Sequence, residues 1–305
     1  MSFVTLLAAL DAQTLADSVG LGAIYALMAI GIGLVFGVLR LVNFAYGQLI
    51  MAGAYTLAFT AHWRVAWSIV ACFVVVVALS LVMDRAVFRP LRGASPAVML
   101  VATFAIAFML QAIALLVDIR DNTIGEIATS IAPLNQPTSI GGVDIRKITI
   151  VAVAVTAVVL ALMAALLLRT TLGLHMRAAA ADFGTARLLG VRANRVIAFA
   201  VFLSGLLAAI VAVMLTVQFP FVGPDFALRD TIVVLVGVVV GGIDRLWTAT
   251  LGGFAIGFTT GIINGALPTE QTVFLPSAVF ALVILVLLLR PAGLFAWGRT
   301  ATERV

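Results

Sequence analysis

The sequence predicts an all-α, polytopic membrane protein with about eight or nine transmembrane helices. Of the 305 residues, 64% are hydrophobic and only 10% are charged, and the mean hydropathy is +1.24. Soluble domains are nearer half apolar and a quarter charged, so this chain would expose too much hydrocarbon in water. Its apolar residues also gather in runs of about 20, the length that crosses a bilayer as a helix. We expect one integral membrane domain over residues 1–305.

Nine apolar segments are the candidate spans. They cover residues 14–36, 41–61, 65–83, 97–117, 148–168, 196–218, 229–241, 247–265 and 273–289. The second segment begins in polar residues, which suggests a broken helix. The seventh is short, so it either crosses the membrane or forms a re-entrant pair with the eighth. These two segments leave the count between eight and nine.

The distribution of basic residues predicts the orientation. With nine crossings and the C-terminus inside, five of the 18 basic residues lie outside. The other thirteen lie inside: Arg40, Arg85, Arg89, Arg92, Arg169, Arg177, Arg187, Arg192, Arg195, Arg245, Arg290, Arg299 and Arg304. Short inner loops are enriched in arginine and lysine, so we expect the N-terminus outside and the C-terminus inside. The segment 169–195 is then cytoplasmic, and 118–147 is the longest outer loop.

Catalytic and metal-binding motifs are missing from the sequence. The only lysine, Lys147, does not follow the glycines of a phosphate-binding loop, so the chain itself is not expected to hydrolyse ATP. His62 and His175 are far apart, and Cys72 is the single cysteine. We therefore expect neither an enzyme nor a bound metal or cofactor. No charged residue falls in the middle of a predicted span, which argues against a proton-driven carrier.

A group of uncharged polar residues opens the second span. Asn43, Tyr46, Gly47 and Gln48 lie at its inner end, where hydrocarbon offers no hydrogen-bond partners. They either cap a broken helix or line a substrate path. Other polar residues within spans are weaker candidates for substrate contact and are typical of hydrogen bonds between helices: Tyr25, Thr103, Gln111 and Asn264.

Glycines repeat every four residues in the eighth span. Gly253, Gly257, Gly261 and Gly265 would form one ridge on a helix, where the backbone of a neighbour can approach closely. Tight helix packing is the simpler interpretation, and a sliding surface used during transport is the alternative.

The inner segment 176–191, MRAAAADFGTARLLGV, is alanine-rich, basic and helical in composition. A helix of small residues fits a groove on a partner protein, and its arginines can pair with acidic residues there. The same arginines would also suit a helix that lies on anionic lipid headgroups. The outer loop 118–147 is rich in turn-forming residues and either covers the outer mouth or contacts a partner.

Five ordered stretches carry a family likeness. They are GAIYALMAIGIGLVFGVLRLVNFAYGQLIMAGAY, FRPLRGASPAVMLVATFAIAFMLQ, LGLHMRAAAADFGTARLLGVRANRVIAFAVFLSGLLAAIVAVML, VVGGIDRLWTATLGGFAIG and LLLRPAGLF. Together they resemble the permeases of branched-chain amino acid ABC transporters, of the H-type subunit, over nearly the whole chain. The resemblance implies a multi-pass protein of the bacterial inner membrane that carries branched-chain or other small amino acids.

The resemblance also implies partners. A separate cytosolic ATPase would bind ATP, a second permease, identical or paralogous, would complete the path, and an extracytoplasmic binding protein would deliver the substrate. The coupling segment that docks on the ATPase would comprise Arg177, Ala178, Asp182, Ala186, Arg187, Leu189, Gly190 and Val191.

The chain departs from the family pattern at two places. Family members commonly have histidine where this chain has Tyr46, and their coupling segment commonly reads AED where this chain has Ala181 before Asp182. Close relatives with the same motifs carry urea or short amides, and aromatic acids are a further possible substrate class. A stand-alone channel or secondary carrier would transport without ATP, and a membrane scaffold would not transport at all.

Overall fold

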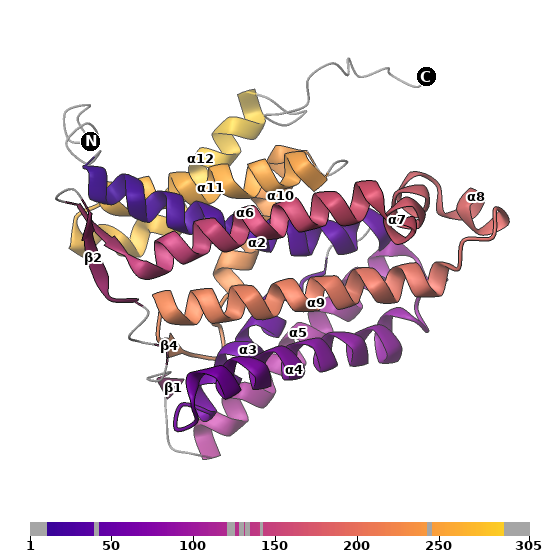
Figure 1. Ribbon diagram of the computed structural model, residues 1–305, viewed down its shortest axis with the longest axis horizontal. Helices are drawn as coiled ribbons and strands as arrows, with labels where there is room; N and C mark the ends of the chain where they lie inside the picture. The colour runs from indigo at the N-terminus through magenta and orange to yellow at the C-terminus, as the bar shows by residue number, and fades with distance from the viewer. Residues whose placement is uncertain are drawn as a thin grey trace.

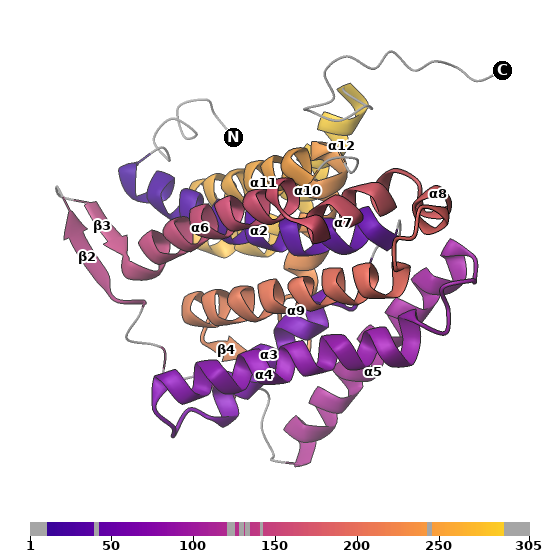
Figure 2. The same cartoon turned by 45° about the vertical axis from the view of Figure 1, so that its right-hand side comes forward.

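A computed structural model describes residues 11–39, 43–120, 126–127, 131, 135–140, 143–242 and 246–289. Within these residues the chain is almost entirely α-helical, and the helices form one bundle (Figures 1 and 2). The predicted fold class, a polytopic all-α membrane protein, is confirmed.

Among the described residues, six helices are long and apolar enough to cross a membrane. They are α2 (Ala12–Leu39), α4 (Val65–Met83, continued by the π-helical turn Asp84–Phe88), α5 (Pro96–Arg120), α6 (Lys147–Arg169), α9 (Ala193–Gln218) and α11 (Leu246–Ala266). Three further apolar helices are shorter: α3 (Tyr46–Phe59), α10 (Leu228–Gly241) and α12 (Leu275–Leu289), with 14, 14 and 15 residues. Each of the nine candidate spans thus contains a helix, while the number of crossings and the orientation stay predictions.

The two ends of the bundle differ in structure. At one end, β1 (Glu126–Ile127) pairs with β4 (Phe221–Val222), and β2 (Pro137–Ile140) pairs with β3 (Val143–Arg146), both antiparallel. We call this the strand end; it lies at the left of Figure 1. The short helices α7 (Thr171–Ala181) and α8 (Phe183–Leu188) lie at the opposite end, which we call the α7–α8 end.

Helix α2 forms the centre of the bundle, against α6, α9 and α11. In the most apolar stretch of each helix, 78% of the residues are buried in α2 and 67% in α9. In α4, α5 and α6 only 22% of them are buried. The outer helices therefore present apolar side chains to the surroundings, which the predicted hydrocarbon would solvate.

The glycine ridge of α11 lies on α2. A Cβ added at Gly257 would lie 2.8 Å from the Cβ of Tyr25, and one at Gly261 would lie 2.6 Å from the Cα of Ser18. Gly253 and Gly265 face α2 in the same way, next to Ala29 and Thr14 respectively. Larger side chains at these positions would push the two helices apart, so the small residues permit the close contact.

The chain contains two halves of similar layout. Helices α3 and α10 have equal length, and α10 follows α3 by 182 positions (46 and 228, 59 and 241). At nearly the same offset, α9 follows α2 and α11 follows α4. Helices α2 and α9 run in opposite directions, since α2 begins at the strand end and α9 begins beside α8 (Figure 1). The two halves are therefore related as an inverted repeat.

Candidate functional site

The break before α3 is shaped by Asn43. Its side chain is buried, and Oδ1 accepts a hydrogen bond from the backbone N–H of Ala45 at 3.1 Å. The N–H of Tyr46 in turn donates to the carbonyl of Asn43 at 3.3 Å. Asparagine stabilises turns in this way, so the Asn43 side chain here serves to begin the helix.

The break before α10 is also a turn closed by a backbone hydrogen bond three residues apart, but with a different conformation at its last residue. Asp225, Phe226 and Ala227 stand where the first half has Asn43, Phe44 and Ala45, and the N–H of Leu228 donates to the carbonyl of Asp225 at 3.0 Å. Ala227 has a φ of 62°, a left-handed conformation that residues other than glycine rarely adopt. Both short helices thus begin at a defined turn.

The first turns of α3 and α10 touch each other. A Cβ added at Gly47 would lie 2.5 Å from Oγ1 of Thr231 and 3.0 Å from the carbonyl oxygen of Ala227. Because only glycine allows this approach, Gly47 brings the two helix starts together. A helix of 14 residues is about 21 Å long, which is less than the hydrocarbon thickness of about 30 Å.

A carboxylate lies beside this contact. The hydroxyl of Tyr25, at the middle of α2, donates to Oδ1 of Asp230 in the first turn of α10 at 2.5 Å. The sequence places Asp230 at the end of a predicted span and suggests no charge at mid-depth. The hydrogen bond with Tyr25 nevertheless brings Asp230 beside the middle of α2.

Two further polar side chains at the start of α3 have no hydrogen-bond partner in the described part of the chain. Tyr46 and Gln48 flank Gly47 and are completely buried, and neither the Tyr46 hydroxyl nor the two amide atoms of Gln48 are bonded. Leaving a buried polar group unpaired costs about 1–3 kcal/mol. Such groups call for a functional explanation.

The weaker sequence candidates are dispersed. Thr103 of α5 lies beside the α3 turn, where its hydroxyl accepts from the N–H of Phe44 at 3.4 Å. Gln111 is half-buried in α5, and Asn264 is exposed near the end of α11. Tyr25 is therefore the member of this group with a contact to a charged residue.

The predicted coupling segment forms the projecting α7–α8 end (Figures 1 and 2). Ala178 is half-buried in α7, and Arg177 lines an apolar groove of about 550 Å³ between α2, α6, α7 and α11. Ala186 is buried in α8, whereas Val191 is half-buried after it. Arg187 belongs to α8, and its side chain lies outside the described part of the structure.

Asp182 joins the two short helices. Its carboxylate accepts from the Thr185 hydroxyl at 2.6 Å and from the backbone N–H groups of Gly184 and Thr185 at 2.9 and 3.1 Å. The Thr185 hydroxyl first, and these backbone N–H groups in addition, hold the pKa of the exposed Asp182 carboxyl below its usual value. Asp182 therefore serves as the N-terminal cap of α8.

Gly190 ends α8. It has a φ of 87°, and the N–H of Val191 donates across it to the carbonyl of Ala186 at 3.0 Å. This six-residue closure is the Schellman motif, which requires a left-handed residue. No other group lies within 4 Å of a Cβ added at Gly190, so its backbone conformation is what demands glycine.

Two adjacent leucines form the tip of α8. Leu188 is 89% exposed and Leu189 is 80% exposed. Leu189 belongs to the predicted coupling segment and Leu188 does not, although both lie in the same Leu-Leu-Gly stretch. A pair of exposed leucines on a projecting loop is typical of a protein contact surface.

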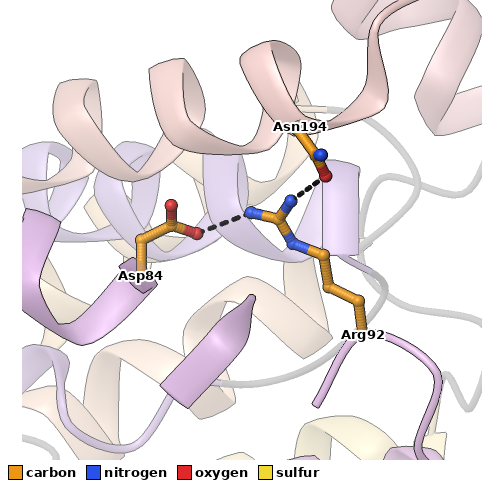
Figure 3. A network of polar contacts seen from close by, with 3 residues as sticks. All are labelled: Asp84, Arg92 and Asn194. Carbon is orange, nitrogen blue, oxygen red and sulfur yellow. Dashed lines mark hydrogen bonds and ion pairs between the residues drawn. The ribbon is translucent and has the colours of Figure 1, made fainter. Parts of the chain in front are cut away.

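A buried ion pair ties this end together. Asp84, at the end of α4, accepts from Nη2 of Arg92 at 2.8 Å, and Arg92 also donates to Asn194 in the first turn of α9 (Figure 3). The Asp84 side chain is only 5% exposed. Because α9 begins directly after the coupling segment, this contact connects that segment to the α4–α5 connection.

No cluster of three or more histidine, cysteine or acidic residues occurs among the residues that the structure describes.

Comparisons with known proteins identify the family of the chain. The family model for the permease component of the branched-chain amino acid transport system matches residues 14–289. The chain is 30% identical to the high-affinity branched-chain amino acid transport system permease protein BraD of Pseudomonas aeruginosa, covering 96% of this chain and 97% of the relative. It is 27% identical to the permease protein LivH of Escherichia coli K12, with the same coverage. No solved structure matches the chain.

Proposed function

Because the chain belongs to the family of permease components of branched-chain amino acid transport systems, we propose that it is the permease subunit of an ATP-binding-cassette importer for branched-chain amino acids. It is a multi-pass membrane protein, as its apolar helices and its relatives indicate. The two relatives named above are high-affinity branched-chain amino acid permeases, which favours these substrates over urea or short amides.

The exposed tip of α8 is the structural observation that supports the ATPase contact in this proposal. We propose that Leu188 and Leu189 dock on a cytosolic ATPase, and that the Asp182 cap and the Gly190 turn hold the loop that presents these two leucines. Charged residues on either side supply further contacts or rest on lipid headgroups. ATP is bound by the partner alone, a second permease completes the path, and a binding protein delivers the amino acid.

Reconstitution tests the function directly. The chain is placed in liposomes with its ATPase, second permease and binding protein, and uptake of labelled leucine and urea is measured with and without ATP. We expect leucine uptake that requires ATP. Uptake of urea in place of leucine would support the alternative substrate, and leucine uptake without ATP would indicate a channel or a secondary carrier.

Two leucine variants test the docking surface. Leu188→Ser and Leu189→Ser should lower ATPase recovery with the tagged permease and lower leucine uptake, because each removes apolar contact area. Leu116→Ser is the matched control, since Leu116 is 66% exposed in the last turns of α5, which leads to β1 at the strand end. If both tip variants retain the ATPase and the uptake, the docking proposal is wrong.

A further inference from the structure

The meeting point of α3 and α10 combines features of a substrate site. Each helix begins inside the bundle at a break, and the two breaks occupy corresponding positions of the inverted repeat. Helix starts carry a partial positive charge from their aligned peptide groups. In membrane proteins, paired short helices at such positions mark sites for polar substrate groups. Broken backbone is otherwise costly in hydrocarbon.

The side chains there carry complementary chemistry. Asp230 supplies a carboxylate at the start of α10, held by the Tyr25 hydroxyl at 2.5 Å. Gln48 supplies two amide donors and one acceptor at the start of α3, and Tyr46 supplies a hydroxyl, all buried and unbonded among the described residues. One side of the contact thus suits a cation, and the other suits an anion.

We propose that this meeting point binds the zwitterionic head of the transported amino acid, with Asp230 accepting from its ammonium group and the Gln48 amide donating to its carboxylate. This inference rests on the proposed function and adds the part of the molecule that recognises the substrate. A zwitterion needs both charges matched, whereas urea and short amides need neither.

Binding requires the two helix starts to separate. The Gly47 backbone touches Thr231 and Ala227, so the structure is closed at this contact. The Tyr46 hydroxyl lies against Gly31 of α2, so α3 must move away from α2 as well as from α10 to free it. In that open form Gln48 and Tyr46 gain partners in the substrate or in water. The cost of keeping these groups unpaired in the closed form is thereby relieved in the open form.

Three variants in the complete transporter test the site. Asp230→Asn removes the charge, and Gln48→Met removes the amide at nearly constant shape. The control, Asp225→Asn, removes an exposed carboxylate from the same connection and copies the Asn43 of the first half. Leucine uptake in liposomes, ATPase activity stimulated by the binding protein, and thermal stability are measured for each.

We expect Asp230→Asn and Gln48→Met to lower leucine uptake about 10- to 100-fold, as loss of hydrogen bonds to charged groups does. The stimulated ATPase activity should persist, because the coupling segment is unchanged. Gln48→Met should also melt at the same or a higher temperature than the wild type, because it removes unpaired buried groups. Asp225→Asn should behave as the wild type.

Two results would overturn the inference. One is full leucine uptake by both variants, and the other is a joint loss of uptake, ATPase activity and thermal stability in Gln48→Met, which indicates a structural role. Failure of the proposed function looks different, because the wild-type complex would then not import leucine with ATP. A wild type that imports leucine beside fully active variants refutes only this site.

Discussion

Replacing Arg92 by methionine should destabilise the permease strongly. The substitution leaves the Asp84 carboxylate, 5% exposed, without its cationic partner. Removal of one partner from a buried ion pair costs about 3–5 kcal/mol. Because the Arg92 side chain is 15% exposed, water can reach part of the site, and we expect the lower end, about 3 kcal/mol. By the scaling of domains, this corresponds to a melting temperature lowered by roughly 6–12 °C.

A double-mutant cycle separates this cause from general damage. Asp84→Asn should cost less than Arg92→Met, because Arg92 can still donate to Asn194 and reach water. The double variant should recover much of the stability, since no unpaired carboxylate remains. Thermal unfolding of the purified protein, followed by tryptophan fluorescence, measures all three. Arg89→Met, which removes an exposed arginine from the same connection, is the control and should melt as the wild type.

Arg92→Met melting as the wild type, or a double variant that shows the sum of the two single losses, would contradict this prediction. Either result would mean that the Asp84 carboxylate is solvated by other means, and the contact in Figure 3 would then contribute little to stability.

Three further predictions concern the two ends of α8 and the glycine ridge of α11. Gly190→Val should lower ATPase recovery, since a left-handed backbone costs a branched residue about 1–2 kcal/mol, whereas Gly190→Asn should be tolerated; equal recovery would contradict this. The cap formed by Asp182 has a lowered pKa, so its stabilisation is complete above the usual carboxyl pKa of about 3.9 and is lost as the pH falls through the lower folded value. A spin label on α8 should therefore keep its mobility from neutral pH down to about pH 4, and loosening at any pH between 4 and 7 would contradict the assignment. Gly257→Leu should reduce the yield of folded protein by forcing α11 off α2, while Gly37→Ala, with no atom within 4 Å of its Cβ, should not.

The sequence is informative wherever a local pattern has one physical solution. Apolar runs locate the helices, and the four-residue spacing from Gly253 onward predicts a ridge that the structure places on α2. The polar residues around Asn43 indicate a break, and the structure has a turn there. In each case the pattern itself spans only a few positions along the chain, although the partner of the ridge, α2, is distant in sequence.

Contacts between distant segments could not be predicted in this way. Asp230 looks like a residue at a membrane surface until α10 is seen to begin beside the middle of α2. Arg92 resembles the other loop arginines, because its partner Asp84 has no sequence mark of burial. The repeat of Asn43–Ala45 at Asp225–Ala227 covers only three residues, too few to notice without the matching helices.

The central position of α2 also affects how the protein is made. Its most extensive contact is with α11, and Leu246 follows Leu39 by 207 positions. At about 5–20 residues per second, the ribosome needs about 10–40 s to supply that partner. During this interval the face of α2 that will receive the glycine ridge has no permanent neighbour. A nascent chain released before α11 emerges would therefore present this face to other proteins of the membrane, as a target for quality control.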